Sequence, residues 1–125
     1  MNDEIRKWEK HASRVVSDHR IFKIREDHTT NPRTGSEHEM VVLECPDWVN
    51  IIALTPEREV VFVEQYRQGS ETVELEIPGG MMDPGETDPV ATALRELREE
   101  TGYTGENARL IGACFANPAL SLIHI

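Results

Sequence analysis

In the second half of the chain the spacing of apolar residues changes from that of a strand to that of a helix. This change constrains the fold more than any other feature. Pro78–Gly85 is rich in glycine and proline, which predicts a stiff loop. After this loop, Asp88 is a good N-cap, Pro89 suits the first helical position, and Gly102 stands where a left-handed C-cap is expected. The pattern predicts a helix over Pro89–Thr101.

The predicted helix carries its carboxylates and its apolar side chains on different sides. Glu96, Glu99 and Glu100 recur at i, i+3 and i+4 and therefore share one side. Val90, Leu94 and Leu97 lie on the other side. Clustered carboxylates repel one another, and their hard oxygens are the ligands that Mg²⁺ or Mn²⁺ prefers. The spacing therefore indicates a divalent-cation site of the kind that pyrophosphate hydrolysis needs.

The same segment has a purely structural explanation, which the residue pattern leaves open. An acidic outer face is common on solvated amphipathic helices, and Arg95 and Arg98 can pair with neighbouring glutamates. Gly79 and Gly80 are as compatible with plain turns as with a backbone that approaches a phosphate or a metal closely.

Short β-branched and apolar runs around the helix predict strands. We expect them at Ser13–Val16, Ile21–Ile24, Met40–Glu44, Val49–Leu54, Glu59–Gln65, Val73–Ile77 and Ala108–Phe115. Asp18–Arg20 and Gly69–Glu71 predict turns, and the polar segment Thr29–Glu37 predicts a loop. Val73–Ile77 alternates as a half-buried strand does. Several strands, one helix and a further strand predict a mixed α/β layer fold.

Composition narrows the class of protein and its partners. A chain of 125 residues has room for one domain with a modest core. The net charge of −10 argues against a nucleic acid or an anionic membrane as partner. No apolar run approaches the roughly 18 residues that cross a bilayer, and the acidic N-terminus is unlike a signal peptide. Cys45 and Cys114 lack metal-ligand spacing, which indicates reduced thiols and a cytoplasmic protein.

Residues 80–103 resemble the Nudix box, G-x5-E-x7-R-E-U-x-E-E-x-G-U, where U is a bulky apolar residue. Gly80 and Glu86 have the spacing of the first half, and Arg95–Tyr103 fits the second half. Eight residues rather than seven separate Glu86 from Arg95. We expect the extra residue in the loop, because the helical register from Asp88 onward is intact.

The resemblance implies a fold and a metal site. The Nudix fold is α/β, an α/β/α sandwich around a mixed β-sheet, here with an N-terminal antiparallel strand region. The family binds Mg²⁺, with Mn²⁺ as a possible substitute, at positions that fall on Glu96, Glu99, Glu100 and the carbonyl of Gly79. Arg95 and Glu86 would pair to hold the loop against the helix, supporting catalysis from behind the ligands.

Three further segments look like the ADP-ribose pyrophosphatase branch of this family. They are the sequences PDWVN at 46–50, EQYR at 64–67 and LEIPGG at 75–80. The resemblance implies hydrolysis of the diphosphate of ADP-ribose or another nucleoside diphosphate sugar to a nucleoside monophosphate and a sugar phosphate. Arg67 would contact the diphosphate, Gly80 would adjoin the substrate, and Trp48 either stacks on the base or packs structurally.

The branch also implies a homodimer formed through the N-terminal strands, which leads to a division of the chain. Residues 1–45 form the predicted dimerisation arm, and 46–119 form a Nudix domain that is incomplete at its C-terminus. Residues 120–125 read as a non-native tail, since they match one frame of a transposase sequencing adapter. The general base of this branch lies on a later loop, so none is assigned.

Two alternatives to a nucleoside diphosphate sugar hydrolase stay open. One is a Nudix pyrophosphohydrolase for another nucleotide, such as a dinucleoside polyphosphate or a nucleoside triphosphate. The other is a Nudix domain that senses nucleotides without catalysis. Such domains commonly lose box carboxylates, and this chain has all of them.

Overall fold

The computed structural model describes residues 4–120 and 123–124, and they fall into two compact units. Among the described residues, one unit comprises 4–45 with 115–120, and the other comprises 46–114 with 123–124. The predicted tail lies partly outside the described residues, at 121, 122 and 125. Within the described ranges, no helix has the length and apolar character needed to span a membrane.

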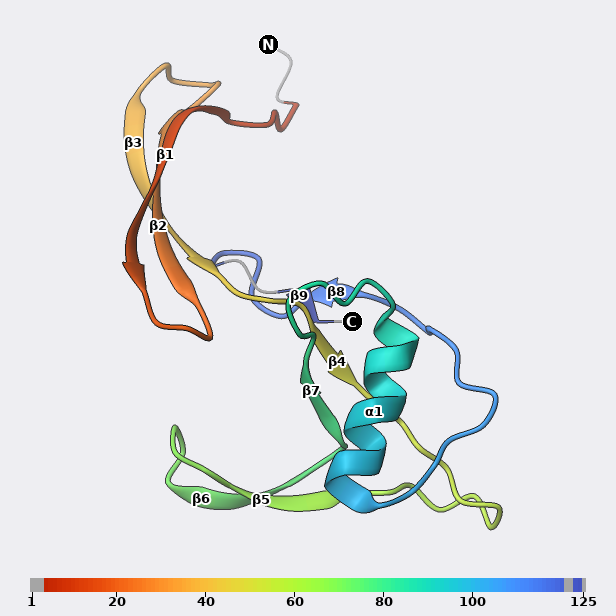
Figure 1. Cartoon of the computed structure of the whole chain (residues 1–125). Helices are drawn as coiled ribbons and strands as arrows, with labels where there is room; N and C mark the ends of the chain where they lie inside the picture. Colours follow the sequence, from red (N-terminus) through yellow and green to blue (C-terminus); the bar gives the residue numbers. More distant parts are fainter. Residues whose placement is uncertain (1–3, 121–122, 125) are drawn as a thin grey trace. The chain divides into compact units, whose positions relative to one another are not determined.

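The first unit contains a three-stranded antiparallel sheet of order β1-β2-β3 (Figure 1). Its strands are β1 (Glu9–Asp18), β2 (Lys23–Thr30) and β3 (Glu37–Glu44). The sheet confirms the predicted antiparallel strand region and its first hairpin.

The strands of this sheet run further than the sequence predicted. Thr29 was expected in a loop but pairs with His38, and Glu37 pairs with Thr30. Ile21 was expected in a strand but lies in the turn that precedes β2. Polar residues on both faces of a solvated sheet hide the alternation by which a strand is recognised, so pairing decided these ends.

Asp27 is a buried carboxylate in the middle of β2, at 6% exposure. Arg25 donates to it from Nε at 2.9 Å and from Nη2 at 3.0 Å. The Ser13 hydroxyl also donates to Asp27, and the Lys10 ammonium lies 3.7 Å away. The Arg25 hydrogen bonds, helped by Ser13 and Lys10, hold the pKa of Asp27 below its usual range although burial opposes this.

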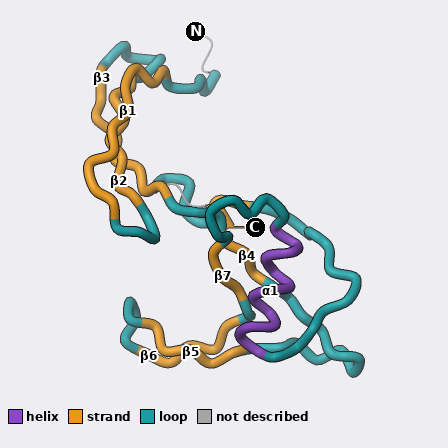
Figure 2. Tube along the Cα trace, in the orientation of Figure 1, coloured by secondary structure: helices purple, strands orange, loops and turns teal. Residues whose placement is uncertain are grey.

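The second unit combines a mixed sheet, a separate hairpin and one helix (Figures 1 and 2). The sheet has the order β7-β4-β9-β8, in which β4 pairs antiparallel with β7 and parallel with β9. The hairpin is β5-β6. The elements are β4 (Trp48–Asn50), β5 (Val63–Arg67), β6 (Thr72–Glu76), β7 (Gly79–Met81), α1 (Pro89–Thr101), β8 (Cys114–Phe115) and β9 (Ile123–His124).

Helix α1 has the predicted bounds and the predicted caps. The Asp88 carboxylate accepts from the backbone N–H of Val90 at 2.9 Å and of Ala91 at 3.3 Å. Gly102 closes the helix in the left-handed conformation, at φ 77°, where a side chain would be strained. The helix buries Leu97 at 3% exposure, and the sheet buries Val49 at 2%. These residues form the small core that positions α1 on β7 and β4.

Several predicted strands of the second unit were wrong in extent. The predicted strand Val49–Leu54 stops at Asn50, and β5 starts at Val63 instead of Glu59. Between them only Leu54 and Val60 form a bridge. A strand needs a partner as well as β propensity, and the described chain supplies little more than that bridge along this stretch.

Two further predictions about this unit also fail. Most of Ala108–Phe115 lies outside any strand, with β8 limited to Cys114–Phe115. The predicted loop Pro78–Gly85 contains β7, because Gly79 and Gly80 pair with β4 and leave no side chain to obstruct it. Glycine content indicated a loop here, whereas the close approach of two backbones needed the glycines in a strand.

In the β5-β6 hairpin, side chains of β6 alternate between exposed and half-buried as predicted, but the apolar ones are exposed and the polar ones are half-buried. Val73 is 64% exposed and Leu75 is 66% exposed, while Glu74 and Glu76 are half-buried. The alternation was recognised correctly as a strand, but the face directed inward carries polar contacts rather than apolar ones.

Candidate active site

Gly80 on β7 lies directly against the Glu96 side chain of α1. A Cβ atom at Gly80 would overlap the carboxylate of Glu96. A Cβ atom at Gly79 would overlap the carbonyl oxygen of Val49 on the paired strand. Gly79 is therefore required by space, because the overlap is with backbone. At Gly80 the missing side chain forms a cradle for the Glu96 carboxylate, which would have to move if a Cβ atom were present.

Arg95 connects the loop, the strand and the helix. Its Nε and Nη2 donate to the two carboxylate oxygens of Glu86 at 3.3 and 3.1 Å. Its Nη1 donates to Glu96 at 2.8 Å and to Glu99 at 3.2 Å, and Nη2 also reaches the Met81 carbonyl at 3.4 Å. The Glu86 hydrogen bonds raise the pKa of Arg95 most, and Glu96 adds to the effect.

Glu86 is held from three sides at the end of the glycine loop. Besides Arg95, it accepts from the backbone N–H of Asp83 at 2.7 Å and from the Thr92 hydroxyl at 3.0 Å. Arg95 first, and the Asp83 N–H second, lower the pKa of Glu86. The Glu86–Arg95 contact is thus present although the chain has one extra residue between them.

Glu100 has different partners from the other two glutamates of the cluster. One carboxylate oxygen accepts from the Gln65 side-chain amide at 2.8 Å. The other accepts from the Gly79 backbone N–H at 3.0 Å. Both of these donors are neutral, so they orient the carboxylate without neutralising its charge.

Arg67 forms a bidentate ion pair with Glu76. Its Nε and Nη2 donate to the two Glu76 oxygens at 2.7 and 2.5 Å, and the side chains are 41% and 32% exposed. Glu76 raises the pKa of Arg67, with a smaller contribution from Glu100, and Arg67 in turn lowers the pKa of Glu76. The arginine expected to meet a diphosphate therefore already holds a carboxylate.

The donor set suits a hard divalent cation, although the side chains are not gathered around one point. Among the described residues, no three His, Cys, Asp or Glu side chains form a ready-made metal site. Glu96 and Glu99 nevertheless share one cationic partner, the Arg95 Nη1. Carboxylate oxygens cradled at a glycine strand fit Mg²⁺ or Mn²⁺ chemically. A shared ion would require Arg95 to release the Glu96 and Glu99 carboxylates.

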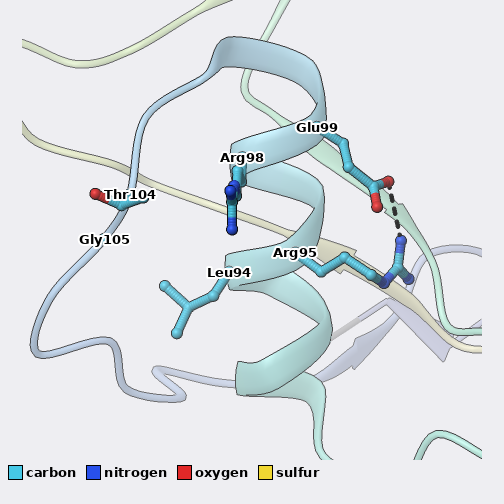
Figure 3. Close-up of a pocket in the computed structure, with 6 residues that line it drawn as sticks. All are labelled: Leu94, Arg95, Arg98, Glu99, Thr104 and Gly105. Carbon is cyan, nitrogen blue, oxygen red and sulfur yellow. Dashed lines mark hydrogen bonds and ion pairs between the residues drawn. The ribbon is translucent and has the colours of Figure 1, made fainter.

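A groove of about 640 Å³ runs along α1 beside this cluster (Figure 3). Figure 3 shows Arg95 turned toward Glu99 and away from Leu94. The groove is lined by Leu94, Arg95, Arg98, Glu99, Thr104 and Gly105. It shares Arg95 and Glu99 with the carboxylate cluster but does not include the Gly80 cradle.

Trp48 lies half-buried on β4, opposite Met81 of β7.

Three residues that contact the site were not predicted from the sequence: Gln65, Glu76 and Thr92. Thr92 carried a signal, since it is a polar residue one turn after the N-cap, where a hydroxyl can reach back to the loop. Gln65 and Glu76 carried none, because their partners are fixed by tertiary structure.

Comparison with known proteins defines the class of protein. Residues 46–121 match the NUDIX domain family, and the chain belongs to this family. A crystal structure of an ADP compounds hydrolase superposes with a TM-score of 0.82 over 98% of this chain and 66% of that one, at 21% identity. The superposition confirms the predicted α/β Nudix fold.

Two curated relatives are similar in sequence. The chain is 38% identical over 108 residues to the methanol dehydrogenase activator of Bacillus methanolicus, covering 85% of this chain and 57% of that protein. It is 36% identical over 93 residues to the ADP-ribose pyrophosphatase of Bacillus subtilis, covering 73% of this chain and 50% of that protein. The chain thus spans about half the length of these relatives.

Proposed function

We propose that the protein is a Mg²⁺-dependent pyrophosphatase that cleaves the diphosphate of ADP-ribose or another nucleoside diphosphate sugar. The products are a nucleoside monophosphate and a sugar phosphate. The observation that carries the proposal is the set of α1 carboxylates, Glu96, Glu99 and Glu100, beside the glycines of β7. The substrate class is supported by similarity to a protein named ADP-ribose pyrophosphatase.

The metal ligands of this proposal are the three α1 glutamates and the Gly79 carbonyl. A bound Mg²⁺ supplies charge neutralisation at phosphate oxygens and a bound water of lowered pKa. Glu86 and Arg95 act behind the ligands, since Arg95 donates to Glu96 and Glu99 while Glu86 fixes its guanidinium. Gly80 leaves space beside Glu96 that any side chain would fill.

Arg67 is the proposed contact to the substrate diphosphate. Glu76 takes the Nε and Nη2 edge of its guanidinium, and the Nη1 edge can meet a phosphate oxygen in a second bidentate contact. Trp48 is the proposed platform for the base.

The assembly and the compartment belong to the same proposal. Val15 and Met40 lie on the same face of the β1-β2-β3 sheet and are 52% and 37% exposed, which suits a homodimer formed through this sheet. Cys45 and Cys114 are both free, which fits the reducing cytoplasm. Sedimentation equilibrium tests the dimer, because a monomer at micromolar concentration would exclude it.

Product analysis tests the activity. Incubation of the 125-residue chain with ADP-ribose and Mg²⁺ should release AMP and ribose 5-phosphate. Glu96→Gln should lower the rate by at least 10-fold, because it removes an anionic ligand. Glu106→Gln is the matched control, since it removes the same charge from an exposed residue beyond α1.

The two alternatives are outcomes of the same assay. Preferential turnover of a dinucleoside polyphosphate or a nucleoside triphosphate would indicate that the enzyme acts on that substrate class instead. Tight nucleotide binding without any product, by a protein that also carries the later loop with the general base of this branch, would favour a sensing domain.

A further inference from the structure

The three glutamates of α1 differ in the charge of their partners. Glu96 and Glu99 both accept from the Arg95 guanidinium. Glu100 accepts from Gln65 and from the Gly79 backbone N–H, which are neutral. These hydrogen bonds orient the Glu100 carboxylate without neutralising it, and Arg67 acts on it only through a weaker electrostatic interaction.

Gln65 can reach Glu100 because of the face of strand β5 on which it lies. Alternate residues of a strand share a face, so Gln65 and Arg67 point to the same side, and both are half-buried. Tyr66, on the opposite side, is 55% exposed. The face of β5 that carries Gln65 is the one directed at the end of α1, and its Gln65 amide bridges 35 residues of sequence to Glu100.

We propose that Gln65 is a positioning residue, which together with the Gly79 N–H holds Glu100 as a ligand for the divalent cation. This inference rests on the metal site of the proposed function. A carboxylate has about four acceptor sites. The two donors use one site on each oxygen, and the remaining sites stay open to a cation.

A neutral amide suits this task better than a cationic side chain. A lysine or arginine at the same place would attract the carboxylate but would repel an incoming Mg²⁺ or Mn²⁺. The amide restricts the Glu100 rotamer and adds no positive charge of its own. Residues that orient metal ligands in this way typically contribute about 10- to 100-fold to metal affinity.

The test is Mn²⁺ binding to the full chain, followed by electron paramagnetic resonance of the free ion. Gln65→Leu should raise the Mn²⁺ dissociation constant by about 10-fold. Gln68→Leu is the matched control, because it removes the same amide from an exposed turn residue three positions away, and it should leave the affinity unchanged.

A double-mutant cycle separates positioning from a general structural role. In a Glu100→Gln background, Gln65→Leu should have no further effect on Mn²⁺ affinity, because the residue acts only through Glu100. An equal loss in both backgrounds would overturn the inference, as would wild-type affinity in the single variant. If Gln65→Leu unfolds, Gln65→Met repeats the cycle with an unbranched side chain of similar length.

The same measurement distinguishes failure of the inference from failure of the proposed function. Wild-type protein that binds no Mn²⁺ would remove the metal site itself, and with it both proposals. Wild-type protein that binds Mn²⁺ and a Gln65→Leu variant that binds it equally would remove only the role of Gln65.

Discussion

Both units of the chain contain an arginine–carboxylate network, and the two networks differ in burial. In the first unit the Asp27 side chain is 9% exposed and is enclosed by Arg25, Ser13 and Lys10. In the second unit the Glu96 and Glu99 side chains are 14% and 59% exposed and share Arg95. An enclosed carboxylate has its oxygens occupied and can only stabilise the fold, whereas a carboxylate at the surface keeps oxygens that a cation can reach.

The largest expected effect comes from filling the cradle of the second network. Gly80→Ala places a Cβ atom where the Glu96 carboxylate lies, so that carboxylate must leave β7. We expect the Mn²⁺ affinity to fall by about 10- to 100-fold, measured by calorimetry. Gly69→Ala is the control, because a Cβ there has no atom within 4 Å. Unchanged affinity in a folded Gly80→Ala protein would contradict a role for the cradle.

Removal of the enclosed charge should affect stability and leave metal binding intact. Asp27→Asn weakens the hydrogen bonds from Arg25, and we expect the free energy of unfolding to fall by about 2 kcal/mol in a denaturant titration. Asp18→Asn is the control, since Asp18 forms an exposed pair with Lys23 at 3.6 Å and should change stability by about 0.5 kcal/mol. A parallel loss of Mn²⁺ affinity in Asp27→Asn would break the distinction between the networks.

The pH dependence of stability sharpens the same comparison. The pKa of Asp27 is lowered in the folded state relative to an unfolded value of about 3.9. Its contribution is therefore present above that value and is lost as the pH falls through the lower folded pKa. We expect the stability difference between wild type and Asp27→Asn to shrink below about pH 4. Thermal unfolding from pH 7 to pH 3 measures it, and a constant difference would show that Asp27 is not shifted.

The smallest effect is expected at the hydroxyl that ties the glycine loop to α1. Thr92 is fully buried, and its hydroxyl donates to Glu86 at 3.0 Å and to the Asp88 carbonyl at 3.3 Å, so Thr92→Val removes both contacts at nearly constant volume. We expect a loss of about 1 kcal/mol in the free energy of unfolding. Thr104→Val, at an exposed position, should have no measurable effect. Equal stability of wild type and Thr92→Val would mean that the loop does not depend on this contact.

The part of the fold that the sequence predicts best is α1, with its caps at Asp88 and Gly102. The strands are predicted less well, as the late start of β5 at Val63 and the truncated β4 show. Helical hydrogen bonds join residues four positions apart, so a short window contains the whole signal. A strand requires a partner that can lie anywhere in the chain.

In the candidate site, too, the local features were predictable from the sequence and the long-range contacts were not. The helical spacing of Glu96, Glu99 and Glu100 was readable from the sequence, and the resemblance to the Nudix box located Glu86 and Arg95. The partners of those residues were not readable. Gln65 lies 35 residues from Glu100, and no periodicity connects them.

The sequence by itself determined one capped helix with three carboxylates on one side, because helix geometry depends on neighbours within a few residues. Only the tertiary structure decided which carboxylate meets Arg95 and which meets a neutral amide, and that Gly80 of β7 lies against the Glu96 side chain of α1. It also decided that Val73 and Leu75 face outward while Glu76 holds Arg67. These outcomes depend on contacts between distant segments, which form only when backbone pairing brings the segments together.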